Sequence, residues 1–395
     1  MTVVPGWQCH RGPSGLVLRV WLRCHRKRFR WFRQTLLCES MVSAVPSTRT
    51  GENVDRNRVG SDHNTATLSD VARLAGVSTA TASKALNGRD QVKAETRERV
   101  FAAAQQLSFT PNPFARALND KRTGTIGMLT SDLDNRFVLP VLLGAEDAFG
   151  AGATSVLLCD ARGDAIREQH HLRTLLARRV DGIVILGRTT NPRPSISQGI
   201  PVPVVYAYAP SDDDADTSFT PDNYLAGKLA VEHLLDRGRT SIALINGEPS
   251  YSAATDRAAG ARDAMAARGL TLEGGEGLYG QWTESWGRQG TRTLLDAGRK
   301  IDGIVAGSDQ IARGILDELR ESQLRVPEDV AVIGVDNWDI LAQASRPPLT
   351  SVDMQLQELG RAAALALSTA IGGASSPGVN RLPVRVVPRE STASV

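Results

Sequence analysis

After about Thr123 the sequence alternates short apolar runs with stretches about one helix long. Runs of this kind are typical of buried strands, and they are Ile126–Thr130, Ser155–Cys159, Gly182–Leu186, Val202–Tyr206, Ile242–Asn246, Ile304–Ala306 and Val330–Val335. Strands that alternate with helices form parallel sheets covered by crossover helices. About 270 residues are more than one small sheet uses, so the pattern predicts an α/β fold of two lobes with a cleft between them. Ligands of such sheets lie at the carboxyl ends of the strands.

A separate helical module precedes these runs. Thr67 and Asp70 are spaced as a capping box, which predicts a short helix whose apolar face holds Leu68, Val71, Ala72, Leu74 and Ala75. Gly76 then permits a sharp turn, and Ser78 caps a second helix that runs to about Leu86. A third helix over about 94–107 closes a small core through Val100, Ala103, Ala104 and Leu107. The two short helices therefore predict a helix-turn-helix in an all-α head.

The second helix of a helix-turn-helix enters the major groove of DNA. We therefore expect Thr79, Ala80 and Lys84 to face base edges, with Lys84 donating to guanine and the other two packing on a thymine methyl. Phosphate contacts are expected from the polar residues Ser78, Thr81, Ser83 and Asn87. Residues 65–123 carry nine Lys or Arg and five Asp or Glu, a net charge of +4 that suits a polyanion. The alternative is a structural bundle whose polar face contacts only water.

The first 64 residues have a different composition. Residues 1–40 carry eight Arg or Lys against Glu39 alone, a charge of +7, whereas the other 355 residues sum to −4 of the total +3. A basic arm that grips phosphates and a targeting peptide are two hypotheses for this segment. We favour a third, in which residues 1–64 are a disordered basic and polar extension and translation starts at Met41 or later.

Cysteine spacing, apolar run lengths and the lack of catalytic motifs argue against a zinc protein, a membrane protein and an enzyme. The four cysteines form no C-x-x-C pair and no spacing that suggests zinc, so no metal site is expected and the thiols fit a reducing cytosol. The best early apolar stretch, 15–22, is interrupted by Arg19, which excludes a membrane span there. The sequence also lacks G-x-G-x-x-G, P-loop, H-E-x-x-H and G-x-S-x-G motifs, so we expect no cofactor and no catalysis.

From Thr67 to its end the chain resembles the LacI/GalR family of bacterial transcription repressors. The motifs of the head are Leu68-Ser69-Asp70-Val71-Ala72-Arg73-Leu74-Ala75-Gly76-Val77-Ser78, Thr81-Ala82-Ser83-Lys84-Ala85-Leu86-Asn87, Glu95-Thr96-Arg97-Glu98-Arg99-Val100 and Pro111-Asn112-Pro113. The resemblance implies that residues 113–119 form a hinge helix on the operator, with Leu118 wedged between base pairs in the minor groove. It divides the chain into a helix-turn-helix domain at 65–110, a hinge at 111–123 and a two-lobed effector-binding and dimerisation domain at 124–395.

The second region matches the effector domain of the family, whose fold is that of periplasmic sugar-binding proteins. The motifs, in family order, are Asp222-Asn223 with Gly227, Arg257 with Gly260, Ser308-Asp309-Gln310, Gly334-Val335-Asp336 and Pro348-Leu349-Thr350-Ser351-Val352. The resemblance implies that Asp222, Arg257 and Asp336 bind polar groups of an effector, and that Phe137 and Trp282 cover it. A guanidinium donates and a carboxylate accepts, which suits the hydroxyls of a sugar or related metabolite.

Each of these residues also has a structural interpretation. Asp309 and Asp336 could cap the helices that follow their strands, and Arg257 could form a surface ion pair with Asp256 or Asp263. Trp282, like Trp286 and Trp338, could be a core residue.

The sequence thus predicts a cytoplasmic, homodimeric DNA-binding regulator, a repressor, that binds a pseudo-palindromic operator under the control of a small-molecule effector. A solute-binding protein is one alternative, but it should begin with a signal peptide and has no use for residues 67–119. An α/β enzyme with a structural helical head is the other, and it needs a phosphate-binding loop or a nucleophile with its base.

Overall fold

A computed structural model of the chain describes residues 66–86, 91–109, 122–150 and 154–393, and the backbone of residues 8–12 and 15–19. The chain divides into two compact units, Met1–Asn64 and Thr65–Val395. In the first unit, β1 (Gln8–Gly12) pairs with β2 (Gly15–Arg19) in antiparallel fashion. The hypotheses of a basic arm, a targeting peptide or a disordered extension with a later start concern a segment, residues 1–64, that lies mostly outside the described residues. No helix in the described part of the chain is long and apolar enough to cross a membrane.

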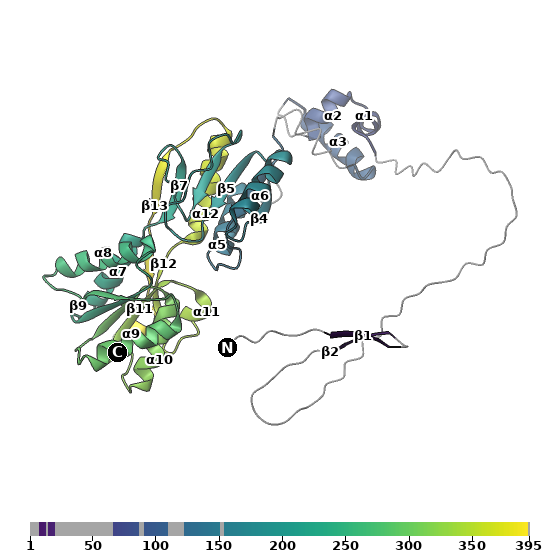
Figure 1. Cartoon of the computed structure of the whole chain (residues 1–395). Coiled ribbons are helices and arrows are strands. Elements are labelled where there is room, and N and C mark those ends of the chain that lie inside the picture. Colours follow the sequence, from purple (N-terminus) through teal and green to yellow (C-terminus); the bar gives the residue numbers. More distant parts are fainter. Residues whose placement is uncertain are drawn as a thin grey trace. The chain divides into compact units, whose positions relative to one another are not determined.

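The second unit begins with three short helices, α1 (Leu68–Ala75), α2 (Thr79–Leu86) and α3 (Ala94–Gln106) (Figure 1). The predicted capping box is confirmed, because the Thr67 hydroxyl accepts the Asp70 N–H at 3.3 Å and the Asp70 carboxylate accepts the Thr67 N–H at 3.0 Å. Gly76 ends α1 at a φ of +66°, where a residue with a Cβ would be strained. The Ser78 hydroxyl accepts the Thr81 N–H at 3.1 Å and so caps α2.

The three helices share one small apolar core. Its buried members are Val71, Ala72, Ala75, Ala82, Ala85, Val92, Val100, Ala103 and Ala104. The prediction for Leu74 is wrong, because its side chain is 47% exposed. At about 100° of rotation per residue, Leu74 lies roughly 110° from the centre of the stripe that the other predicted residues form, so it faces solvent.

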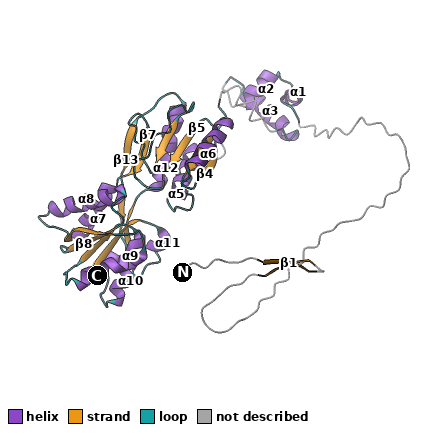
Figure 2. Ribbon diagram, in the orientation of Figure 1, coloured by secondary structure: helices purple, strands orange, loops and turns teal. Residues whose placement is uncertain are grey.

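Lobe 1 consists of the described residues from 122 to 221 together with 356–382, and it is built on a six-stranded sheet. The strands are β3 (Thr125–Thr130), β4 (Ser155–Asp160), β5 (Gly182–Leu186), β6 (Val204–Ala207), β7 (Thr217–Pro221) and β13 (Gly378–Leu382). They are all parallel and run in the order β13-β7-β6-β5-β3-β4. Helices α5 (Val138–Phe149) and α12 (Leu356–Ile371) pack on one face, and α6 (Ala165–Ala177) packs on the other (Figure 2).

Lobe 2 consists of residues 223–353 and 385–393 and has the same layered plan. Its strands are β8 (Ile242–Asn246), β9 (Glu273–Tyr279), β10 (Gly303–Ala306), β11 (Ala331–Asp336), β12 (Thr350–Asp353) and β14 (Arg385–Val387). The order is β14-β12-β11-β10-β8-β9, and β14 alone is antiparallel to its neighbour. Helices α7 (Asn223–Leu235) and α8 (Ser252–Ala266) cover one face, whereas α9 (Glu284–Asp296) and α10 (Asp309–Glu321) cover the other. The short helices α11 (Asp339–Ala342) and η1 (Glu390–Thr392) complete the lobe.

The chain passes between the lobes three times: from β7 to α7, from β12 to α12, and from β13 to β14. The predicted two-lobed α/β fold with parallel sheets is therefore confirmed. Each of the seven predicted apolar runs contains a strand, with end shifts of a few residues. For example, β6 begins at Val204 rather than Val202, after Pro203, which has no N–H to donate to a neighbouring strand.

Glycines bring three pairs of helices into backbone contact. A Cβ on Gly227 of α7 would lie 1.9 Å from the carbonyl oxygen of Arg257, and a Cβ on Gly260 of α8 would lie 1.9 Å from that of Tyr224. The pairs α5–α12 and α9–α10 show the same reciprocal arrangement, through Gly144 with Gly360 and Gly287 with Gly314. The contact between α7 and α8 fixes the backbone at Arg257, a predicted site residue.

Candidate functional site

Helix α2 carries the side chains that were predicted to contact DNA. Ala82 and Ala85 are buried against α1 and α3, whereas Thr79, Ala80 and Lys84 are exposed on the rest of the helix. Ser78 is also exposed, and Thr81 and Ser83 are partly buried. The positions assigned to base edges thus point away from the core, and their contacts with DNA remain predictions. Asn87 and Leu118, like the hinge at 113–119, lie outside the described residues.

A cavity of about 430 Å³ lies between the two lobes. Lobe 1 contributes residues that follow β3, β5 and β6, including Asp132, Arg136, Phe137, Arg188, Thr190 and Tyr208. Lobe 2 contributes residues that follow β8, β9, β10 and β11, including Tyr251, Arg257, Trp282, Gln310, Asp336 and Trp338. The lining therefore comes from segments beyond the carboxyl ends of the strands, which is where a parallel sheet binds its ligands.

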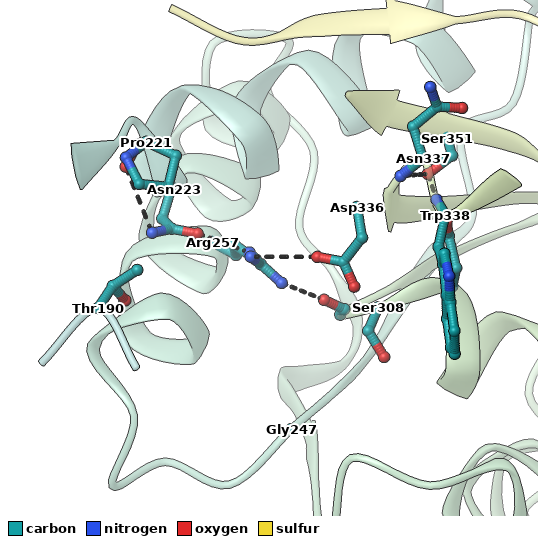
Figure 3. Close-up of polar contacts among 12 residues, drawn as sticks. Thr190, Pro221, Asn223, Gly247, Arg257, Ser308, Asp336, Asn337, Trp338 and Ser351 are labelled. Atoms are coloured by element: carbon teal, nitrogen blue, oxygen red, sulfur yellow. Dashed lines mark hydrogen bonds and ion pairs between the residues drawn. The ribbon is translucent and has the colours of Figure 1, made fainter. Parts of the chain in front are cut away.

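Arg257 and Asp336 form what we call the floor of this cavity. Arg257 is held in place by hydrogen bonds within lobe 2 (Figure 3). Its side chain is only 5% exposed. Its Nε donates to Asn223 Oδ1 at 2.9 Å, and its Nη1 donates to the carbonyl oxygen of Gly307. Its Nη2 lies 3.8 Å from Asp336 Oδ1. Two donors are thus fixed by the protein, and the third faces the carboxylate across the cavity floor.

The surface ion-pair interpretation of Arg257 is wrong. Asp256 lies 3.9 Å from Arg381 instead, and Asp263 accepts the hydroxyl of Tyr224 at 2.7 Å. Burial of Arg257 beside Asp336 is the arrangement that a charge needs when it is removed from water.

Asp336 ends β11 at a φ of +114°, and its carboxylate connects the two lobes. Oδ2 pairs with Nη2 of Arg136, which belongs to lobe 1. Burial alone would lower the pKa of Arg136, but the Asp336 carboxylate outweighs it and raises that pKa, so the guanidinium stays charged. The helix-cap interpretation of Asp336 is wrong, because Trp338 occupies the N-cap position of α11.

Asp309 lies behind Asp336 and is fully buried. Its carboxylate accepts the Trp338 N–H at 2.7 Å and the Ser351 hydroxyl at 2.5 Å. Burial, and then the negative charge of Asp336, hold the pKa of Asp309 well above its usual range. The cap of α10 is the hydroxyl of Ser308, which accepts the Ile311 N–H at 3.3 Å, so the cap interpretation of Asp309 is wrong as well.

Aromatic rings form the walls of the cavity. The ring centroids of Phe137 and Tyr208 are 4.9 Å apart in lobe 1, and those of Tyr251 and Trp282 are 5.7 Å apart in lobe 2. The Trp282 ring lies directly on Gly247, where a Cβ would approach it to 2.1 Å. An apolar wall with a few convergent polar groups is the usual form of a small-molecule site. Trp282 and Trp286 both pack on the core of lobe 2, but Trp286 does not line this cavity, and its Nε1–H donates to Asn246 O.

The structure brings four of the five predicted effector residues to this cavity, namely Phe137, Arg257, Trp282 and Asp336. Asp222 lies outside the lining: it caps α7, where its Oδ1 accepts the Leu225 N–H at 2.8 Å. Among the lining residues that sequence reasoning did not assign to the site are Arg136 and Tyr208. Each follows a predicted strand by a few residues, so strand ends were the available signal.

Comparisons with known proteins cover both regions of the chain. Residues 67–112 match the family described as bacterial regulatory proteins, lacI family, and residues 231–392 match a periplasmic binding protein-like domain. The ribose operon repressor of Escherichia coli K12 is 35% identical over 326 residues, which are 82% of this chain and 97% of that protein. The HTH-type transcriptional regulator CelR of Thermobifida fusca is 33% identical, over 81% of this chain and 95% of that protein.

Solved structures of transcriptional regulators are also similar to most of this chain. A lac repressor dimer bound to operator and the anti-inducer ONPF is 28% identical, with a TM-score of 0.65 over 83% of this chain and 99% of that one. A CelR–cellobiose complex is 32% identical, with a TM-score of 0.59 over 82% of this chain and 99% of that one.

Proposed function

This chain belongs to the LacI family of bacterial regulatory proteins, and from that premise we propose that a hydroxyl-bearing small molecule in the cavity between the lobes controls its affinity for operator DNA. The chain is a DNA-binding transcriptional regulator, as its family is. The observation that carries the proposal is the buried Arg257–Asp336 pair on the floor of an aromatic-walled cavity. Its ligand is a sugar or a related metabolite.

The chemistry of the floor supports this class of ligand. Asn223 and Gly307 fix the Arg257 guanidinium, so it offers a hydrogen-bond donor in a defined direction. The Asp336 carboxylate offers acceptors. The faces of Phe137 and Trp282 suit the apolar faces of a sugar ring. In the solved relatives, CelR is bound to cellobiose and the lac repressor to the anti-inducer ONPF.

The contacts between the lobes supply a mechanism. Besides the Arg136–Asp336 ion pair, Asn191 of lobe 1 donates to Ser250 O at 2.9 Å and accepts the Ser252 N–H at 2.8 Å. A ligand that binds one arrangement of the lobes more tightly than another shifts the population toward it. That shift changes operator affinity by no more than the difference between the two effector affinities.

On DNA the protein acts as a cytoplasmic homodimer. Two copies of α2 read the major groove of a pseudo-palindromic operator, whose half-sites are about one helical turn apart. Lys84, Thr79 and Ala80 face the bases, whereas Ser78, Thr81, Ser83 and Asn87 contact phosphates. Leu118 of the hinge inserts into the minor groove.

The proposal is tested by selecting DNA from a random pool with the full-length protein at two salt concentrations. We expect a palindromic motif that stays enriched at the higher salt, because base contacts depend less on salt than phosphate contacts do. Binding without any motif, with affinity that collapses as salt rises, would contradict operator recognition.

The selected operator then reports on the effector. A panel of sugars is screened for compounds that change operator affinity, and the screen is repeated with Arg257→Ala. We expect this variant to bind the operator normally and to lose the response. Arg262→Ala is the matched control, because Arg262 lies on the same helix α8 with a 40% exposed side chain. A normal effector response in Arg257→Ala would refute the site.

A further inference from the structure

Two of the hydrogen-bonding groups that line the cavity are buried donors without a partner. Two buried side-chain atoms of the lining, Arg136 Nε and Trp282 Nε1, have no hydrogen-bond partner among the described residues. A guanidinium and an indole can donate but cannot accept. Because a buried donor without a partner is costly, these two groups favour a ligand that brings acceptors into the cavity.

The Asp336 carboxylate beside these donors is engaged on one oxygen. Oδ2 pairs with Arg136, whereas Oδ1 lies 3.8 Å from Arg257, too far for a hydrogen bond. Oδ1 can therefore accept a hydroxyl of the ligand. The donors without a partner need acceptors, and an anionic group supplies these without having to donate in return.

The buried charges point the same way. Two guanidinium groups, those of Arg136 and Arg257, face the one carboxylate of Asp336, and Asp309 behind it favours its neutral form. Asp132, Asp134 and Arg188 also line the cavity; Asp134 and Arg188 are exposed, whereas Asp132 is partly buried, as Arg136 is. Charges in contact with water are screened, whereas those of the floor act at short range in a medium of low polarity. Two guanidinium groups therefore face one carboxylate around Asp336, whereas the lining as a whole has three arginines and three aspartates.

Arg136 is held in a fixed orientation by stacking. The centre of its guanidinium lies 4.3 Å from the ring centroid of Phe137 and 5.1 Å from that of Trp338, and its Nη2 is fixed by Asp336. On the Nε edge, Nε has no partner among the described residues and can donate to a ligand, while Nη2 of the same edge already serves Asp336. A guanidinium edge fits two oxygens of one carboxylate or phosphate group, which a lysine ammonium cannot match in geometry.

We propose that Arg136 determines the specificity of the effector site by binding an anionic group, a carboxylate or a phosphate, on the effector. This inference rests on the proposed effector site and narrows its ligand from a neutral sugar to an acidic or phosphorylated one. Arg257 and Asp336 bind the hydroxyl-bearing part, while Arg136 and the Trp282 N–H bind the anion.

The test uses the full-length protein and simple anions as probes. Trp282 and Trp338 line the cavity, so binding there changes tryptophan fluorescence. Sodium phosphate and sodium acetate are titrated separately against sodium chloride of the same ionic strength. We expect a saturable change with at least one anion, and the anion that binds more tightly distinguishes a phosphorylated effector from a carboxylic acid.

Three variants identify the residue responsible. Arg136→Met should weaken anion binding at least tenfold, whereas Arg136→Lys, which keeps the charge, should weaken it less. Arg162→Met is the matched control, since it removes a 73% exposed positive charge from the same lobe and should change nothing. Thermal unfolding checks that each variant is folded, and the lysine variant provides the comparison if the methionine variant is not.

No saturable response to either anion, or an equal response in wild type and Arg136→Met, would overturn the proposal. A selected effector that is neutral and binds equally well to Arg136→Met would overturn it too. A different result would refute the proposed function. If anion binding depends on Arg136 but no ligand of the cavity changes operator affinity, the anion site is supported and effector control is refuted.

Discussion

Of the residues of α2, we expect Lys84 to contribute most to sequence recognition, because it is exposed and an ammonium can donate to the acceptors of a guanine. If the contact is to a base, Lys84→Ala should cost about 1–3 kcal/mol at one base pair of the operator and little elsewhere. Binding to a set of operators with single substitutions measures this. Lys93→Ala is the control, since Lys93 is exposed at the start of α3 and makes no predicted base contact. An equal loss on every sequence would instead identify a phosphate contact.

Asp309 should make stability depend on pH in an unusual direction. Its pKa is raised in the folded protein by burial and by Asp336, so the folded state keeps a proton that the unfolded state releases near pH 4. The stability that this proton provides is complete below about pH 4 and is lost as the pH rises toward the raised value.

Asp309→Asn mimics the protonated acid and removes this dependence. Relative to wild type, the variant should gain at least about 1 kcal/mol of unfolding free energy between pH 5 and pH 7, measured by urea denaturation. Asp329→Asn is the control, because Arg325 lowers the pKa of partly exposed Asp329 to about 2, and its contribution changes only at lower pH. Parallel curves for wild type and Asp309→Asn would show that Asp309 is ionised when folded.

At the scale of helices, backbone contact between α7 and α8 positions the effector site. Gly227→Ala places a methyl group against the carbonyl of Arg257, so the helices must separate. We expect a loss of about 1–3 kcal/mol in stability and a weaker effector response, since Arg257 moves with α8. Lys228→Ala, at the neighbouring partly exposed position, should change stability by less than about 0.5 kcal/mol. Full stability and full response in Gly227→Ala would contradict this role for the contact.

The strands that could be predicted from the sequence are those with continuous apolar runs, which belong to the interior of the two sheets and to β4. Five other strands of the two lobes were missed: β7, β9, β12, β13 and β14. Strand β7, with the sequence TSFTP, is mostly buried but polar, and its Thr220 hydroxyl is satisfied by the carbonyl of Tyr208 at 3.1 Å. Strand β9 is rich in glycine and lies at a sheet edge, where apolar side chains are not required. Local patterns do not contain this tertiary information.

In the candidate site, too, some residues could be predicted from the sequence and others could not. Arg257 and Asp336 were predicted through motifs, and both line the cavity. Asp222 belongs to the same motif set but satisfies the first turn of α7, a role that sequence spacing does not distinguish from ligand binding. The ion pair between Arg136 and Asp336 could not be predicted, because the two residues lie 200 positions apart in different lobes. Contacts of this kind exist only once the two lobes have been brought together.

At the scale of the whole molecule, regulation requires that the lobes change their arrangement. Asn191 makes two hydrogen bonds across the lobes without lining the effector cavity. We expect the effector to favour the arrangement of the lobes that these two bonds stabilise. Asn191→Ala should therefore weaken effector binding about tenfold by making that arrangement less populated, since two hydrogen bonds contribute roughly 1–3 kcal/mol. Calorimetric titration of the effector measures this. Asn380→Ala is the control, because the side chain of Asn380 bonds only within lobe 1.

The same change should appear at the operator. If effector binding alters operator affinity by some factor, operator binding must alter effector affinity by that factor, because the two equilibria share one conformational change. We expect the two ratios to agree in wild type. In Asn191→Ala, operator affinity without effector should shift opposite to the change that the effector causes in wild type, because the variant favours the arrangement that the effector disfavours. The contrary result is that Asn191→Ala weakens effector binding and yet leaves operator affinity without effector unchanged. That result would show that the DNA-binding helices do not respond to the arrangement of the lobes that Asn191 stabilises.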